Sequence, residues 1–337
     1  SDELLITYSV DSGSYGNLMA VQNTDDGTIY NEPAALDTDF DGEGDCSGDN
    51  TIPALTQGTG GGGCAVSTSN FKTNSQWQEQ HNYFGWKAQK ATGVPNWHES
   101  ILTSAKVFQP ERNWWLIPDF SADLGDIKGV WEASRFDWVI GLAQLAAQGD
   151  GLALKKLNLW LNDWSLSNPP YKGVNWKCGQ EASIRVMHLA MAAIILKQHN
   201  SNNPPLVSFI HAHLQRILPT ISYAVAQDNN HGTSEAAALF IGGSWLKLLG
   251  ESKGNVFYKQ GRKWLENRAK HLIENDGSFS QYSTTYHRVM LDTYSMAEVW
   301  RIKLALPEFT SSLTTKLKAA TNWLYQFTQF ETGDAPN

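Results

Sequence analysis

Three polar clusters lie where the sequence predicts that helices begin. The first is Asn229-Asn230-His231, the second contains Tyr286-His287-Arg288, and the third begins at Asn175-Trp176. A helix N-terminus needs only one capping side chain, so the other groups either satisfy buried backbone or face a ligand. An amide, an imidazole and a phenol together are the groups needed to neutralise an anion and to move a proton.

This set of groups suits β-elimination from a uronic acid. The proton on C5 lies next to a carboxylate, so an amide or imidazole donor must neutralise that carboxylate while negative charge builds up. A base then removes the C5 proton, and an acid protonates the departing O4. Tyr286 suits either role. As a base it must ionise about three units below its free pKa near 10, which a cation such as Arg288 or a protonated histidine favours.

Each of these residues also has an ordinary structural interpretation. Tyr286 alone is typical of a buried tyrosine with a satisfied hydroxyl, and Glu181 and Arg185 are spaced for a helix ion pair. His231 and Glu235 are one turn apart, so Glu235 is placed to fix the imidazole tautomer. We find no nucleophile elbow, phosphate loop or zinc-ligand spacing.

Two other function classes remain open on the sequence. A glycoside hydrolase would use two carboxylates, Glu181 with either Glu235 or Asp276, at a defined separation across the bond. That chemistry does not require the Asn-His and Tyr clusters. A non-catalytic glycan-binding protein is the second alternative.

Composition excludes some partners. The 337 residues carry a formal net charge of −8, which argues against non-specific nucleic-acid binding, and no apolar run is long enough to span a membrane. Tryptophan is unusually frequent, at 14 residues. Most of these are expected to pack between helices, and a few are candidates for stacking on sugar rings.

The first 75 residues differ from the rest in being acidic and rich in turn formers. Cys46 and Cys64 bracket a Gly-rich loop, and a disulfide between them would imply an oxidising compartment. A solvated acidic loop is the simpler interpretation of the carboxylates before Cys46, and a structural calcium site is the alternative. The candidate ligands are Asp37, Asp39, Asp41, Glu43 and Asp45.

Apolar periodicity predicts helices from Asp126 onward, with Gly149 ending the first. The others are expected at 152–165, 178–199, 204–226, 232–249, 254–274, 286–304 and 308–330. Short connections containing Pro or Gly favour antiparallel pairing. Sequential helical hairpins with many aromatic residues indicate a mainly α fold, an incomplete helical barrel of the (α/α) toroid type.

The chain resembles the heparinase II/III-like polysaccharide lyases from about Trp77 to its end. The motifs that carry this resemblance are WQEQHNYFGW, GDIKGVWEASRFDWVIGLAQ, NPPYKGVNWKCGQEASIR, NNHGTSEAAALFIGG, DGSFSQYSTTYHR and GDAPN. The resemblance implies an (α/α) toroid followed by a β-sandwich domain. We expect the toroid at residues 76–330 and a linker at 331–337, with the β domain itself absent from this chain and a possible partner of it.

The family's mechanism transfers to this sequence motif by motif. The resemblance implies that Asn230 and His231 neutralise the substrate carboxylate and that Tyr286 is the catalytic acid, and also the base in some members. Asn229 is then the helix cap. The expected substrate-binding residues are His81, Arg135, Trp176, Glu181, Arg185, His287 and Arg288. For His81, Arg135, Glu181 and Arg185, internal packing or ion pairing stays equally open.

The resemblance also predicts a partner and a location. The substrate is an anionic uronate polysaccharide, heparan-sulfate-like or alginate-like, and the chemistry requires no cofactor. This substrate class and the Cys46–Cys64 pair predict a periplasmic or extracellular protein.

Overall fold

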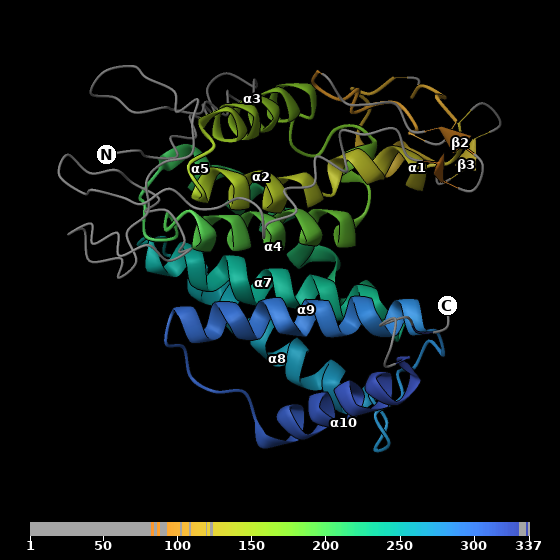
Figure 1. Ribbon diagram of the computed structural model, residues 1–337, viewed down its shortest axis with the longest axis vertical. Helices are drawn as coiled ribbons and strands as arrows, with labels where there is room; N and C mark the ends of the chain where they lie inside the picture. Colours follow the sequence, from red (N-terminus) through yellow and green to blue (C-terminus); the bar gives the residue numbers. More distant parts are fainter. Residues whose placement is uncertain are drawn as a thin grey trace. The chain divides into compact units, whose positions relative to one another are not determined.

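The computed structural model describes residues 82–83, 86–87, 93–101, 103–107, 109–118, 120–121, 124–329 and 335 (Figure 1). These residues are mainly helical, as expected of the predicted fold class. The α-helices are α1 Lys128–Trp131, α2 Asp137–Ala147, α3 Gly151–Ser167, α4 Gly179–Ile195, α5 Pro204–Ile217, α6 Ile221–Ala226, α7 Asn230–Leu248, α8 Gly254–Leu272, α9 Thr284–Lys303 and α10 Ser311–Phe327. Four two-residue strands, β1 Asn82–Tyr83, β2 Trp86–Lys87, β3 Phe120–Ser121 and β4 Gly125–Asp126, form two antiparallel pairs.

The described residues form two compact units. The first contains those up to Lys177 together with Met191–Phe209, and the second contains Cys178–Ala190 together with the residues from Ile210 onward. No helix in the described ranges is both long and apolar enough to cross a membrane.

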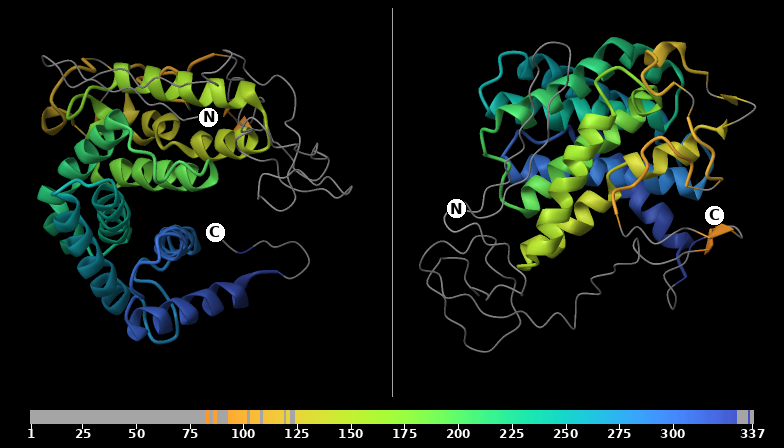
Figure 2. Two further views of the ribbon diagram at one scale, coloured as in Figure 1. Left: turned by 90° about the vertical axis from the view of Figure 1, so that its left-hand side faces the viewer. Right: turned by 90° about the horizontal axis from the view of Figure 1, so that it is seen from above.

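An aromatic cluster forms the core of the first unit. In α2 and α3, which lie side by side (Figure 2), Trp138 and Trp160 meet edge to face with ring centroids 5.2 Å apart. Phe136 packs on Trp164 at 5.1 Å, and Trp97 contacts both Trp138 and Trp160. Edge-to-face contacts of this kind add stability beyond the burial of apolar area. Most of the described tryptophans are therefore packing residues, as the sequence predicted.

The helix expected at 126–148 is interrupted. It consists of α1, the 3-10 turn η4 (Glu132–Ser134) and α2. Phe136 adopts φ 66°, a left-handed conformation that ends one helix before α2 begins. Its side chain is fully buried among the aromatic residues of the core. Tertiary packing of this ring therefore overrides the helical periodicity.

A second interruption occurs within the expected helix 204–226. α5 ends at Ile217, a 3-10 turn η6 follows at Leu218–Thr220, and α6 begins at Ile221. Pro219 has no N–H for the helical ladder, which accounts for the break. The remaining expected helices are confirmed, with ends that differ by a few residues.

In the second unit, α7 and α8 form a very closely packed antiparallel pair. Gly243 lies against the backbone of Tyr258, Gly254 against Lys247, and Gly261 against Phe240. A Cβ atom at any of these glycines would overlap main-chain atoms of the facing helix. Glycine is therefore required at these three positions, which we call the glycine seam. The seam fixes the axial position of α7 relative to α8.

α9 lies alongside α7 (Figure 1). Trp300 of α9 packs on Trp245 of α7 with centroids 5.2 Å apart, and its Nε1 donates a 2.9 Å hydrogen bond to Ser244 Oγ. The loops that precede α7 and α9 are joined by the hydrogen bonds of Ser280 and Gln281 described below. The N-termini of α7 and α9 therefore lie at the same end of this helical layer.

Several expectations concern residues outside the described ranges. These are the boundary at residue 75, His81, the Cys46–Cys64 pair and the acidic residues Asp37, Asp39, Asp41, Glu43 and Asp45. The expected linker at 331–337 also lies outside them, apart from Ala335.

Candidate functional site

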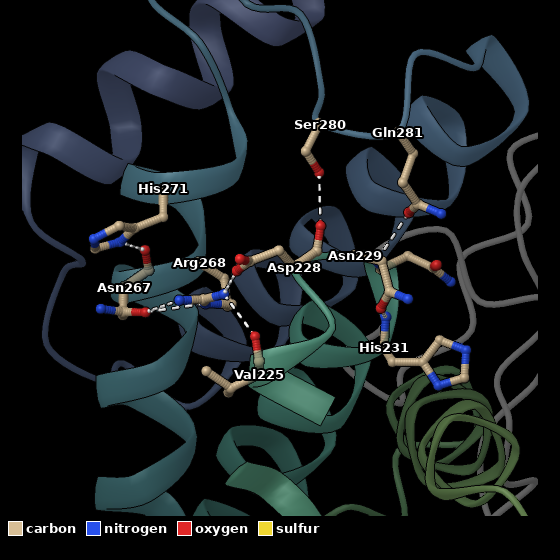
Figure 3. Close-up of polar contacts among 10 residues, drawn as sticks. Val225, Asp228, Asn229, His231, Asn267, Arg268, His271, Ser280 and Gln281 are labelled. Atoms are coloured by element: carbon tan, nitrogen blue, oxygen red, sulfur yellow. Dashed lines mark hydrogen bonds and ion pairs between the residues drawn. The ribbon is translucent and has the colours of Figure 1, made fainter. Parts of the chain in front are cut away.

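The first turn of α7 carries the Asn-Asn-His cluster. Asn229 is the N-cap, and its Oδ1 accepts a 2.9 Å hydrogen bond from the main-chain N–H of His231 (Figure 3). Asn230 and His231 are then the first two residues of the helix. The prediction that Asn229 is the cap is confirmed, which leaves the next two side chains available for another role.

The first turn of α9 carries Tyr286. Ser283 is its N-cap, with Oγ accepting from the Tyr286 N–H at 3.4 Å. Tyr286 is the third residue of α9 and its side chain is 42% exposed. The catalytic tyrosine predicted from the sequence is therefore on the surface and is not a core residue.

Two residues that the sequence motifs did not single out join these helix ends. Gln281 Oε1 accepts a 2.9 Å hydrogen bond from the main-chain N–H of Asn230. Ser280 Oγ donates a 3.1 Å hydrogen bond to the carbonyl of Asp228. Figure 3 shows both contacts. The segment that leads into α9 thus holds the N-terminus of α7, and it places Tyr286 and Asn230 on two connected helix ends.

The three predicted catalytic side chains have unused polar atoms. Within the described residues, no hydrogen-bond partner is found for the Asn230 amide, the His231 ring or the Tyr286 hydroxyl. Asn230 is 4% exposed and His231 is half-buried. The Asn230 amide is not among the buried side-chain groups that lack a partner, so its polar atoms reach solvent. An amide at a helix N-terminus, where the helix dipole favours anions, is therefore placed to donate to an anionic ligand.

Arg268 fixes the turn that leads into α7. Its guanidinium donates to the Val225 carbonyl at 3.0 Å, to Asp228 Oδ1 at 2.6 Å and to Asn267 Oδ1 at 2.6 Å (Figure 3). Asp228 has φ 48°, an uncommon conformation for a residue other than glycine. The almost fully buried Arg268 stabilises this conformation from α8. No motif in the sequence around Arg268 predicted this structural role.

A cluster of buried charges lies on α4, α5 and α7 in the second unit. Its members are Glu181, Arg185, His213, Arg216 and Glu235, each at most 5% exposed. Burial lowers the pKa of Arg185 to about 9 against the opposing effect of Glu181. Its Nε donates to His213 Nε2 at 3.0 Å. The cluster thus brings two glutamates, two arginines and a histidine together in the interior.

The carboxyl of Glu235 is the most perturbed acid of this cluster. Burial raises its pKa to about 8, while the Arg216 guanidinium acts in the opposite direction. Its Oε2 has no hydrogen-bond partner in the described structure. A Cβ on Gly179 would lie 2.5 Å from Oε1, so this glycine makes room for the carboxyl.

The expected pairing of His231 with Glu235 is wrong. Glu235 lies against Gly179 of α4, and no hydrogen bond joins it to the imidazole. Burial lowers the pKa of His231, and the opposing carboxylate is Glu181. Burial therefore favours the neutral imidazole, and the carboxylate that opposes this effect belongs to α4 and not to α7.

Two predicted substrate-binding residues belong to the core. Trp176 is 1% exposed, and its Nε1 donates to the Asn168 carbonyl at 2.9 Å. His287 is also 1% exposed; it stacks on Trp323 at 4.7 Å and contacts the Ala320 carbonyl through Nε2 at 2.9 Å. Consecutive residues of a helix point in directions about 100° apart. The side chain of His287 can therefore be buried while that of its neighbour Tyr286 is exposed.

The charged residues that were expected to bind substrate lie in different environments. Glu181 and Arg185 are buried in the charge cluster, which corrects their assignment to an open cleft. Arg135, in the first unit, forms an ion pair with Glu132. Arg288 is half-buried and donates to the Ala335 carbonyl at 3.0 Å.

The carboxylates considered for hydrolysis are poorly placed for it. Glu181 and Glu235 are each 4% exposed. Asp276 lies in an exposed turn, where its Oδ1 accepts from the N–H and Oγ of Ser278. A hydrolase requires two carboxyl groups flanking a bound sugar. No set of three or more His, Cys, Asp or Glu side chains suited to a metal occurs among the described residues.

The comparisons with known proteins gave matches to solved structures alone. No family model and no curated protein matches the sequence. Heparan sulfate lyase HepC from Pedobacter heparinus is 18% identical, with a TM-score of 0.47, over 84% of this chain and 41% of that one. Two heparinase III structures are 17% and 20% identical, with TM-scores of 0.46 and 0.45, over 78% and 70% of this chain.

The chain spans about two fifths of the length of these solved structures, namely 41%, 41% and 36%.

Proposed function

We propose that this chain carries the helical part of a polysaccharide lyase that cleaves a uronate-containing polymer by β-elimination. One observation carries the proposal: the side chains of Asn230, His231 and Tyr286, on two hydrogen-bonded helix ends, have polar atoms without partners among the described residues. An elimination site needs an anion-neutralising donor next to a proton-transfer group, and these residues are of the required types.

The substrate carboxylate would bind at the N-terminus of α7. The Asn230 amide donates to one carboxylate oxygen, and the neutral His231 imidazole donates a second hydrogen bond. Both interactions strengthen as the C5 proton leaves, because charge then moves onto the carboxylate. The helix dipole adds to this stabilisation.

Tyr286 would carry the proton transfers. The C5–H bond breaks, its electrons form the C4=C5 double bond, and the C4–O4 bond breaks with its electrons on O4. The Tyr286 phenolate takes the C5 proton, and the phenol hydroxyl formed in that step then gives the proton to the departing O4. The reaction consumes no water and generates an unsaturated uronate.

The test follows the ultraviolet absorbance of that unsaturated uronate with heparan sulfate and with alginate as substrates. We expect the absorbance to rise with one polymer, and Tyr286→Phe to lower kcat by about 100-fold or more, the usual contribution of acid–base catalysis. The matched control is Tyr223→Phe, since Tyr223 is also exposed, at 72%, and lies on α6.

Other outcomes would replace the proposal. New reducing ends without the chromophore would establish hydrolysis. Saturable binding without either product would establish a glycan-binding protein. Wild-type turnover by Tyr286→Phe would remove this residue from the mechanism.

A further inference from the structure

Trp115 differs from the other tryptophans. Among those whose side chains the structure describes, it alone is exposed, at 57%, while Trp97, Trp160, Trp164, Trp176, Trp245 and Trp300 are almost fully buried. Its neighbour Leu116 is 50% exposed. Single exposed apolar residues are common, but an exposed tryptophan next to an exposed leucine indicates a contact surface.

The backbone beneath this indole is held in place. Trp115 lies in the 3-10 turn η3 (Trp114–Leu116). The Trp114 N–H donates to the Tyr171 carbonyl at 3.1 Å, and the Gly173 N–H donates to the Arg112 carbonyl at 2.8 Å. Gly173, at φ 77°, permits this close approach, because a Cβ there would meet the Pro110 carbonyl. These contacts tie the turn to residues 171–173.

A second ring supports the first. The Trp114 and Trp115 rings meet edge to face, with centroids 5.9 Å apart and planes at 90°. Trp114 is half-buried and so anchors the pair. An aromatic face that is fixed before binding loses little conformational freedom when a ligand stacks on it.

The charges around the turn are mainly positive. Arg112 and Lys172 are exposed on the two segments that the hydrogen bonds join. Lys177, on the same second segment, donates to the Ile117 carbonyl. Residues 109–119 and 171–177 contain two carboxylates, Glu111 and Asp119, against three cations. This local excess of cations contrasts with the chain's net charge of −8 and favours an anionic ligand.

We propose that Trp115, Arg112 and Lys172 form an accessory binding surface for an acidic polysaccharide, separate in the chain from Tyr286 and its neighbours. The apolar C–H face of a sugar ring stacks on the Trp115 indole, and the two cations pair with carboxylate or sulfate groups of the polymer. The identity of the ligand rests on the proposed lyase function. Charge complementarity favours this occupant over a second copy of the chain, which is itself acidic.

The experiment measures polymer binding without turnover. Alginate and heparan sulfate are titrated into the Tyr286→Phe protein, and into the same protein carrying Trp115→Ala, Trp115→Phe or Leu152→Ala. Leu152 lies in α3 of the same unit and is also 57% exposed, so it controls for the loss of an exposed apolar side chain. Calorimetry gives the affinity, and tryptophan fluorescence reports stacking.

We expect Trp115→Ala to weaken polymer binding about three- to tenfold, Trp115→Phe to weaken it less, and Leu152→Ala to leave it unchanged. Combined Arg112→Gln and Lys172→Gln substitutions should reduce the salt dependence of binding.

The outcomes separate the two proposals. If neither polymer binds or is cleaved by wild type, both proposals fail. If wild type generates unsaturated product while Trp115→Ala binds long chains as tightly as its parent, this proposal alone is overturned. A Trp115→Ala change that dissociates a dimer in sedimentation, with unchanged polymer affinity, would identify an interface between copies and would also overturn it.

Discussion

The main-chain nitrogen of Asn230 lies 2.9 Å from Oε1 of Gln281, 51 residues later in the chain. This hydrogen bond satisfies one of the N–H groups that a helix start leaves without an intrahelical partner. It also ties the N-terminus of α7 to the segment that carries Tyr286. A side chain with no expected chemical role therefore holds two predicted catalytic residues on one framework.

Gln281→Ala should impair the site more than it impairs the fold. Loss of one hydrogen bond of this kind costs about 0.5–1.5 kcal/mol in unfolding free energy. The kcat on the uronate polymer should fall about tenfold, because Asn230 and Tyr286 are then no longer held in fixed positions relative to each other. Gln227→Ala is the control, since among the described residues the Gln227 side chain accepts from the Asn229 side chain and not from the main chain of α7. Equal kinetic losses in both variants would contradict the positioning role of Gln281.

Arg268→Met should destabilise the protein strongly. The change leaves Asp228 and the Val225 carbonyl without the guanidinium that they bind, at an expected cost of about 2–4 kcal/mol in urea unfolding. Lys259→Met on the exposed side of α8 provides a matched removal of a cation. The prediction is wrong if the two variants unfold at the same urea concentration.

Glu235 should make stability depend on pH. Burial raises its pKa from 4.5 to about 8, so the folded protein binds a proton that the unfolded chain releases between these values. The contribution to stability is fully present below pH 4.5 and is lost as the pH rises through about 8.

Glu235→Gln tests this dependence. The variant should lose less stability than wild type between pH 5 and about pH 8, with a difference of a few kcal/mol in urea unfolding. Glu274→Gln, at an exposed position, should follow wild type. Parallel pH profiles for wild type and Glu235→Gln would show that this carboxyl is ionised in the folded protein.

Gly261→Ala and Gly141→Ala should have opposite effects. A Cβ at Gly261 would overlap the backbone of Phe240, whereas nothing lies within 4 Å of a Cβ at Gly141 in α2. The first change should cost more than about 3 kcal/mol by forcing α7 and α8 apart. The second should add about 0.5–1 kcal/mol through helix propensity. Thermal unfolding of both variants measures the difference, and similar melting temperatures would contradict it.

Local signals in the sequence predicted the helices and the Asn229 cap, because periodicity and capping depend on neighbouring residues. The same signals did not predict the break at Phe136, whose left-handed backbone is stabilised by a core assembled from distant residues. Trp176 and His287 were assigned to ligand binding because they lie within motifs. Whether such a side chain faces solvent depends on helix packing that the motif does not encode.

Charge partners were the hardest feature to predict. Spacing along α7 suggested Glu235 for His231, but the acting carboxylate, Glu181, comes from α4. Gln281 and Arg268 were missed for the same reason, since each contacts residues 40 or more positions away. The roles of Asn230, His231 and Tyr286 remain predictions, and the structure adds where their free polar atoms lie.

The glycine seam between α7 and α8 has a consequence for motion. The backbones of the two helices touch at Gly243, Gly254 and Gly261. If α7 moved along its axis by one turn, larger side chains would take the places of these glycines and overlap the facing backbone. The seam therefore locks α7 against axial displacement. Amide hydrogens in the middle of this pair should therefore be among the slowest to exchange with deuterium. Ligand-induced adjustment would then fall to side chains at the start of α7, with the helix itself serving as the fixed reference.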